Sequence, residues 1–246
     1  MLKNFKLTIE YDGSSCSGWQ RQKNGRTIQG EIEKALFTMT GKKVIVIGSG
    51  RTDAGVHAFG QVANFHCDTK LTPEVFLKGL NSLLSDDIVI RESCEVDEKF
   101  HARYDAKSKI YKYGILNRNI SAAVCRQYAW FIRKELDREA MRSAISHILG
   151  THDFKAFEGA GSPRATTVRC VMNAALVEKG HNHLVFEIEA DGFLRFMVRN
   201  IVGTLVDVGL CRITPDDIKQ ILLSKDRNLA GATAPPQGLF LMQVTY

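Results

Sequence analysis

The order in which strand-like and helix-like hydrophobic patterns follow one another most limits what this chain can fold into. In the first half, four segments alternate apolar with polar residues or are rich in β-branched residues, as strands are. These strand patterns lie at 5–11, 44–48, 61–68 and 88–96. Two segments with apolar residues at helical spacing lie between them, at 28–39 and 72–84. This half therefore predicts the order strand, helix, strand, strand, helix, strand.

The second half repeats this order with one additional helix. Its predicted strands lie at 109–116, 167–178, 184–189 and 239–246, and its predicted helices at 140–149, 196–210 and 214–223. Two such units predict an α+β protein of two ferredoxin-like (βαββαβ) halves, with antiparallel sheets covered by helices on one face. We expect an N-terminal half at 1–104 and a C-terminal half at 105–246, although the halves share no evident residue-by-residue similarity.

The composition is that of a soluble globular protein, because 44% of the 246 residues are hydrophobic and 24% are charged. No apolar run approaches the ~20 residues that a membrane helix needs, and residues 1–10 contain no signal-peptide core. We therefore expect a cytoplasmic protein. The six cysteines form no Cys-x-x-Cys pair and no zinc-site spacing with histidine, so we expect free thiols and no metal.

The net charge of +6 permits a polyanionic partner without requiring one. Cations gather in two places: the first group is Arg21, Lys23 and Arg26, near Trp19, and the second is Lys107, Lys109 and Lys112, around Tyr111 and Tyr113. Aromatic side chains among cations are one way in which proteins hold RNA, by stacking on bases. The alternatives are solvated charges and aromatic rings that pack on neighbouring strands, and both interpretations stay open at this point.

The segment 48–57, between two predicted strands, is richer than a turn requires. It contains three glycines, and it brings the acid Asp53, the guanidinium of Arg51 and the imidazole of His57 close together in sequence. Glycines let a backbone take positive φ or approach a ligand closely. We interpret Asp53 as a catalytic carboxylate; the alternative is an aspartate that only stabilises a local turn.

Two other charged residues need an interpretation. Asp12 could be the nucleophile of a magnesium-dependent phosphatase, but such chemistry expects the aspartate two residues earlier, where Glu10 stands, so a turn at Asp12-Gly13 is favoured. Arg199 lies in an otherwise apolar predicted helix. A buried guanidinium there would need an acidic partner, for which Asp53 is the candidate. Alternatively, Arg199 lies on a solvated face.

Taken together, these segments resemble the TruA family of tRNA pseudouridine synthases. The resemblance rests on Tyr11-Asp12-Gly13-Ser14, Gly18-Trp19-Gln20-Arg21-Gln22, 50–57, Gly60-Gln61-Val62, Phe100-His101-Ala102-Arg103, Tyr111-Lys112-Tyr113, Asp153-Phe154, 197–203 and Ala232-Thr233-Ala234-Pro235. These motifs occur in order and cover essentially the whole chain. One departure is visible, because Cys16 stands where family members often have an aromatic residue.

The resemblance implies conversion of uridine to pseudouridine at positions 38, 39 and 40 in the tRNA anticodon stem-loop. It further implies two ferredoxin-like halves packed around a basic cleft, a homodimer, and no metal or organic cofactor. The family's catalytic aspartate falls on Asp53. The other site residues fall on Tyr111, which would stack on the uracil, Arg199, which would pair with the aspartate, Arg51, which would displace the base, and Leu239, which would form an aliphatic wall. Trp19, Arg21, Lys107, Lys109 and Lys112 are expected to bind the RNA.

The isomerisation requires little from the protein beyond an ionised carboxylate and a pocket that holds the uracil. The sequence leaves open whether Asp53 attacks the sugar, attacks the base, or removes the C2′ proton. A non-catalytic RNA-recognition module would share the βαββαβ order, but it needs an aromatic RNP signature that is missing from this sequence.

Overall fold

The computed structural model describes residues 2–159, 161, 165–180 and 182–246. The chain forms two compact units, one made of Met1–Lys107 with Phe240–Tyr246 and the other of Ser108–Leu239. Both units combine helices with mostly antiparallel strands, so the α+β class is confirmed. None of the helices in the described residues is long and apolar enough to cross a bilayer.

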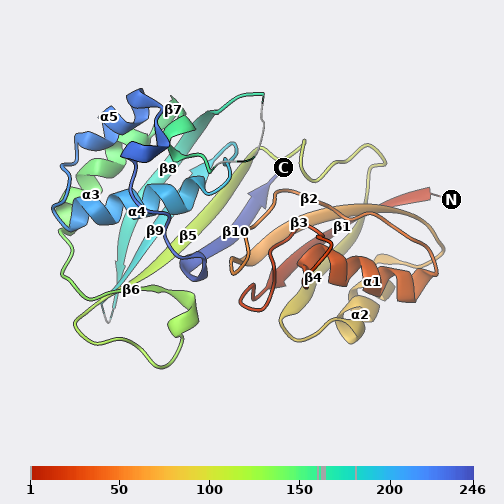
Figure 1. Cartoon of the computed structure of the whole chain (residues 1–246). Coiled ribbons are helices and arrows are strands. Elements are labelled where there is room, and N and C mark those ends of the chain that lie inside the picture. The colour runs from red at the N-terminus through yellow and green to blue at the C-terminus, as the bar shows by residue number, and fades with distance from the viewer. Residues whose placement is uncertain (1, 160, 162–164, 181) are drawn as a thin grey trace. The chain divides into compact units, whose positions relative to one another are not determined.

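The first unit contains all six elements expected for residues 1–104. They are β1 (Leu2–Tyr11), α1 (Ile28–Thr40), β2 (Ile47–Gly48), β3 (His57–Asp68), α2 (Pro73–Leu83) and β4 (Ile88–Val96). β1 lies between β3 and β4 and is antiparallel to both, while β2 is antiparallel to β3. The two helices lie side by side along this sheet (Figure 1). α1 begins at Thr27, whose hydroxyl accepts from Gly30 N–H, and ends at Gly41 with a φ of 67°.

The chain's last strand, β10 (Leu239–Thr245), also belongs to the first unit from Phe240 onward. It pairs in parallel with the beginning of β3, where Phe240 is opposite His57 and Leu241 is opposite Ala58. Parallel pairing requires a long connection, and here that connection contains α2, β4 and the whole second unit. A pairing so remote in sequence cannot be read from local hydrophobic periodicity.

The second unit is larger and has more short elements than we expected. Its elements are β5 (Ser108–Asn117), β6 (Trp130–Ile132), α3 (Arg138–Ile145), β7 (Gly150–Asp153), β8 (Val168–Lys179), β9 (His183–Ala190), α4 (Met197–Gly209) and α5 (Asp217–Ser224). The sheet order is β5-β9-β8-β7, all antiparallel, with β6 parallel to β5. α3 packs against α4 and β8 (Figure 1). β6 and β7 were not predicted, because three or four residues are too short to show a period.

Boundaries near the candidate catalytic segment differ from the sequence-based expectation. β3 begins at His57 rather than at 61, and β2 consists of Ile47–Gly48 only. The segment that contains Asp53 is therefore an eight-residue connection, 49–56, that leaves one short strand and enters one long strand. We refer to residues 49–56 as the Asp53 loop.

The core of the first unit is an aromatic cluster under α2. Phe5 and Phe65 are directly opposite each other on β1 and β3, and their ring centroids are 5.4 Å apart. Phe76 of α2 packs on both rings, at 4.7 Å from Phe5 and 5.3 Å from Phe65. All three side chains are fully buried. Aromatic burial of this kind contributes the large apolar area that holds a helix on a sheet.

We predict that Phe65→Ala lowers the free energy of unfolding by about 3–5 kcal/mol, because it removes a ring that two other rings contact and leaves a cavity. Urea unfolding followed by circular dichroism measures the change. The matched control is Val89→Ala on β4, whose side chain is 40% exposed; we expect it to cost less than about 1 kcal/mol. Equal losses for the two variants would contradict this account of the core.

Candidate active site

Backbone and side-chain hydrogen bonds from the sheet hold the start of the Asp53 loop. At its start, Ser49 N–H donates to the Val62 carbonyl at 2.7 Å, and the Ser49 hydroxyl donates to Gln61 Oε1 at 2.7 Å. The same Gln61 side chain donates from Nε2 to the Gly50 carbonyl at 3.0 Å. Ser49 and Gln61 are fully buried. One buried side chain of β3 thus fixes two successive residues of the loop.

A second buried contact lies immediately beside Asp53. The Tyr11 hydroxyl and the Thr52 hydroxyl are 2.8 Å apart, and both side chains are buried. Burial raises the pKa of Tyr11 well above its ordinary value, although the hydrogen bonds with Thr52 and Gln61 oppose this shift. The phenol is therefore neutral, and either hydroxyl can donate in this hydrogen bond. Sequence reasoning missed Tyr11 as a support, although the alternation of β1 places it on the buried face.

These contacts leave a simple pattern of exposure along the loop. Thr52 is buried, while Arg51 on one side is exposed and Asp53 on the other is half-buried. Val56 N–H donates to the Asp53 carbonyl at 3.2 Å, which closes a turn directly after the carboxylate. Trp19 N–H donates to the Thr52 carbonyl at 3.0 Å, and Gly55 N–H donates to the Cys16 carbonyl at 3.4 Å. The backbone at Asp53 is thus held on both sides.

The buried side chain of Trp19 lies beside the strand that leads into this loop. Its side chain is only 2% exposed. A Cβ added to Gly48 would lie 2.5 Å from the indole ring, so only glycine lets the ring lie this close to the strand. Trp19 was interpreted either as a ring that stacks on a base or as one that packs over a neighbouring strand. The structure shows the packing, and the buried ring has no face exposed for a base. Cys16 is likewise buried, and burial raises the pKa of its thiol.

Asp12 forms the turn that its sequence context favoured. Its Oδ1 accepts from Ser14 N–H at 2.9 Å, which is the hydrogen bond of an Asx turn. The same carboxylate oxygen lies 3.0 Å from Nδ1 of the buried His57, and the His57 ring stacks on Phe240 at 4.7 Å. Gly13 is required here, because an added Cβ would overlap the Val56 carbonyl. No cluster of metal-ligating side chains occurs within the described residues.

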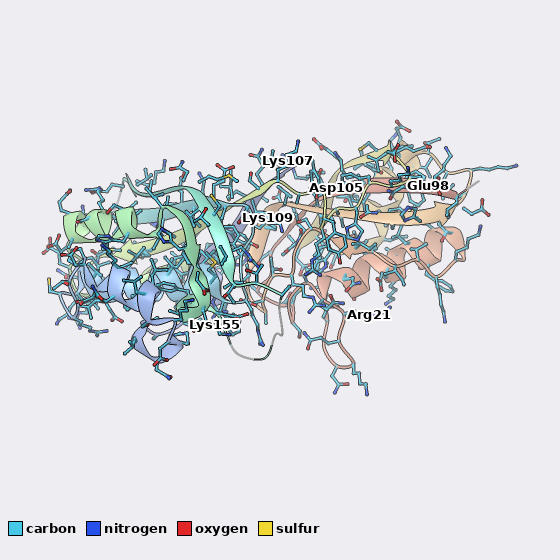
Figure 2. The ribbon with its side chains drawn as sticks, turned by 90° about the horizontal axis from the view of Figure 1, so that it is seen from above. Arg21, Glu98, Asp105, Lys107, Lys109 and Lys155 are labelled. Atoms are coloured by element: carbon cyan, nitrogen blue, oxygen red, sulfur yellow. The ribbon has the colours of Figure 1, made fainter. Side chains whose placement is uncertain are left out.

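Two of the three cations near Trp19 have carboxylate partners. Arg21 Nη1 donates to Glu33 Oε2 at 2.8 Å, while 63% of the Arg21 side chain stays exposed beside α1 (Figure 2). Arg26 makes two hydrogen bonds with Asp87, at 2.5 Å and 2.7 Å, and these bonds hold the pKa of Asp87 well below its usual range. Arg26 therefore fastens the loop after β1 to the turn before β4.

In the second unit, the tyrosines of β5 share one face of the strand. Tyr113 is fully buried and donates from its hydroxyl to the Pro235 carbonyl at 2.7 Å. Tyr111 is 7% exposed and meets the Phe193 ring edge-on at 5.0 Å. Burial raises the pKa of Tyr113 strongly, and the nearby Arg199 cation opposes the shift. Tyr113 is thus a core residue, and Arg199 lies close enough to influence it.

The lysines around these tyrosines differ in position. Lys112 lies on the opposite face of β5, since side chains alternate along a strand, and its Nζ is 2.7 Å from Glu187 Oε1 on β9. Lys109 is half-buried, and Lys107 is exposed at the surface (Figure 2). The grouping of three lysines in the sequence therefore does not become one group around the tyrosines.

Arg199 lies near the beginning of α4 and is half-buried. Its Nε donates to the Ala234 carbonyl at 2.7 Å, while Ala234 N–H donates to the Arg199 carbonyl at 3.1 Å. The guanidinium carbon also lies 5.0 Å from the Phe196 ring centroid, within cation–π range. The fully solvated interpretation of Arg199 is therefore wrong. Leu239, at the beginning of β10, is buried.

Comparison with known proteins identifies the class. A family model described as tRNA pseudouridine synthase matches residues 7–105 and 144–246. The tRNA pseudouridine synthase A of Thermoanaerobacter sp. (strain X514) is 49% identical over 245 residues, which cover 100% of both chains. That of Acetivibrio thermocellus is also 49% identical, again over 100% of both chains. That of Geobacter sp. (strain M21) is 46% identical over 100% of this chain and 99% of the relative.

The matches place the chain in a class of RNA-modifying isomerases. Within that class, it belongs to the TruA family of tRNA pseudouridine synthases, which confirms the resemblance drawn from the motifs.

We predict that Tyr11→Phe lowers the free energy of unfolding by about 1–3 kcal/mol, because the buried Thr52 hydroxyl loses its partner. Urea unfolding measures the loss. The double variant Tyr11→Phe/Thr52→Val should lose less than the sum of the two single variants, since neither partner is then left unsatisfied. Tyr104→Phe, at a 75% exposed position, is the control. Strictly additive losses would show that the two hydroxyls are not coupled.

Proposed function

We propose that this protein isomerises uridine to pseudouridine at positions 38, 39 and 40 of the tRNA anticodon stem-loop, as a cytoplasmic homodimer. The observation that carries the proposal is membership of the TruA family along the whole chain. Asp53 is proposed as the catalytic aspartate because Arg51-Thr52-Asp53 resembles the family's motif. In support, Asp53 lies on a loop whose neighbouring residues are held by buried hydrogen bonds. Catalytic groups need positions fixed in this way.

The proposed architecture is two ferredoxin-like halves, with a boundary near 104, that contribute different residues to one basic cleft. The N-terminal half supplies Asp53 and Arg51, and the C-terminal half supplies Tyr111, Arg199 and Leu239. The βαββαβ order of elements in the first unit supports this assignment. The proposal needs no metal or organic cofactor, because the reaction is an internal rearrangement.

In the proposed reaction, the N1–C1′ bond breaks, the uracil turns, C5 bonds to C1′, and the proton lost from C5 is balanced by one gained at N1. The Asp53 carboxylate begins the sequence as a nucleophile or as a base, and both roles require its ionised form. A guanidinium beside a carboxylate favours the ionised carboxylate. We propose that Arg199 acts on Asp53 in this way.

The remaining residues have roles in holding the RNA. Tyr111, on the buried face of β5, is proposed to stack on the target uracil after the nucleotide has left its helix, and the exposed Arg51 to occupy the vacated space. Leu239 is proposed as the aliphatic wall beside the uracil. Arg21, Lys107, Lys109 and Lys112 are proposed to contact phosphates, which position RNA rather than specify its sequence. Because Trp19 is buried, we assign it to support of the Asp53 loop instead of RNA contact.

We expect Asp53→Asn to lower the rate of pseudouridine formation by at least about 10³-fold, since an amide is neither a nucleophile nor a base here. The dissociation constant for tRNA should change by less than about threefold, because no phosphate contact is removed. Release of tritium from C5-labelled uridine measures the rate. The exposed Asp86→Asn is the matched control. Retained activity in Asp53→Asn would exclude Asp53 as the catalytic residue.

We expect tRNA affinity to fall steeply with salt, with a slope of log K against log salt of about −0.7 to −0.9 per phosphate contact. Lys107→Gln should reduce the slope by about one unit, whereas Lys78→Gln, on the exposed side of α2, should leave it unchanged. Filter binding at several salt concentrations measures both slopes. An affinity that is flat between low and moderate salt would exclude a basic RNA-binding surface.

A further inference from the structure

The segment 230–235, between two short 3₁₀ turns in the second unit, has no regular secondary structure. Because irregular backbone lacks the repeating hydrogen bonds of a helix or sheet, its polar groups must find other partners. The polar groups of this segment form hydrogen bonds with residues of α4, with a residue of β5 and with one arginine. We call residues 230–235 the carbonyl segment, since three of its carbonyl oxygens accept hydrogen bonds from side chains.

The carbonyl segment lies directly on the backbone of α4. A Cβ added to Gly203 of α4 would overlap the Ala232 carbonyl, and a Cβ added to Gly231 would lie 2.9 Å from the backbone of α4. Gly231 N–H also donates to the buried Thr204 hydroxyl at 2.9 Å. The two glycines thus allow an approach that any larger residue would prevent.

Arg227 forms hydrogen bonds with both the carbonyl segment and α4. Its Nη1 donates to the Ala230 carbonyl at 3.0 Å, and its Nη2 donates to Asn200 Oδ1 at 3.0 Å and to the Thr233 hydroxyl at 3.1 Å. The Thr233 hydroxyl in turn donates to Asn200 Oδ1 at 2.6 Å. Asn200 is fully buried on α4 and is the neighbour of Arg199. The acceptors of Arg227 are neutral, and burial lowers the pKa of its guanidinium.

Beyond Thr233, the carbonyl segment contacts two residues near the proposed site. The Ala234 carbonyl accepts from Arg199 Nε at 2.7 Å, and the next carbonyl, that of Pro235, accepts from the Tyr113 hydroxyl at 2.7 Å. Tyr113 is two residues from Tyr111 on the same face of β5. The path from the guanidinium of Arg227 to that of Arg199 therefore crosses only Thr233 and Ala234.

We infer that Arg227 is a positioning residue: it fixes the carbonyl segment to α4 and thereby sets the place of the Arg199 guanidinium. The inference rests on the proposed function, in which Arg199 keeps Asp53 ionised. Arginine suits the task because its planar group has donors on separate nitrogens and stays charged when partly buried. Lysine has a single nitrogen, which cannot reach acceptors on both Asn200 and Ala230 in the same geometry.

The first test compares Arg227→Lys with wild type at saturating tRNA under single-turnover conditions. We expect the rate of pseudouridine formation to fall at least about tenfold, because a small displacement of a catalytic partner has a large effect. The tRNA dissociation constant should stay within about threefold. Arg138→Lys is the matched control, since this arginine pairs with Glu178 on the surface of the same unit. A rate for Arg227→Lys equal to that of the control would overturn the inference.

A double-mutant cycle with Arg199→Lys separates positioning from a general effect on folding. If Arg227 acts through Arg199, Arg227→Lys should lower the rate less than about twofold in the Arg199→Lys background. Independent effects that multiply would overturn the inference. If Arg227→Lys does not fold, Thr233→Val decides instead: we expect a rate loss of about threefold or more with unchanged tRNA affinity, and an unchanged rate overturns the inference.

Failure of the proposed function would look different. In that case the wild-type protein itself would form no pseudouridine. A wild type that is active, and that loses activity on Asp53→Asn but not on Arg227→Lys or Thr233→Val, would leave the proposed function in place and refute only the role of Arg227.

Discussion

The hydrogen bonds from buried side chains of the sheet to the Asp53 loop are the interaction on which the first unit's candidate site depends. Eight residues without secondary structure have high conformational entropy, and a carboxylate on such a loop would not keep one position. Gln61 and Tyr11 remove part of that freedom through contacts with Ser49, Gly50 and Thr52 of the loop. The polar groups are themselves satisfied inside the core, which is the condition under which buried polar networks stabilise a structure.

In the second unit, irregular backbone is also held by hydrogen bonds to regular elements, but the side chains of interest lie on the regular elements. In the first unit, side chains of regular strands fix the irregular loop that contains Asp53. In the second, the irregular carbonyl segment receives hydrogen bonds from the regular elements and so aligns their side chains, Arg199 of α4 and Tyr113 of β5. Both arrangements use backbone carbonyls as acceptors, which are placed more rigidly than side-chain groups. In both arrangements, neighbouring residues fix the position of the side chain in question, Asp53 in the first unit and Arg199 in the second.

Sequence patterns predicted the elements well where the elements are long. The alternation of β1 and the apolar spacing of α1 and α4 reflect burial on one face, which is a local property. Properties that depend on contacts between distant segments were beyond such reasoning. The burial of Trp19 depends on Gly48, and the pairing of β10 with β3 joins His57 and Ala58 to the last strand of the chain. The role suggested for Arg227 depends on Asn200 and Ala230 meeting at one guanidinium.

The parallel pairing of β10 with β3 has a consequence for the order in which the molecule is made. His57 and Ala58, the residues of β3 that follow the Asp53 loop, receive their partners Phe240 and Leu241 only after the entire second unit has left the ribosome. The N-terminal unit can therefore form its aromatic core early, but the start of β3, which follows the Asp53 loop, gains its last pairing partner at the end. A nascent chain that lacks its final residues would be largely folded and yet incomplete where the chemistry is proposed to occur.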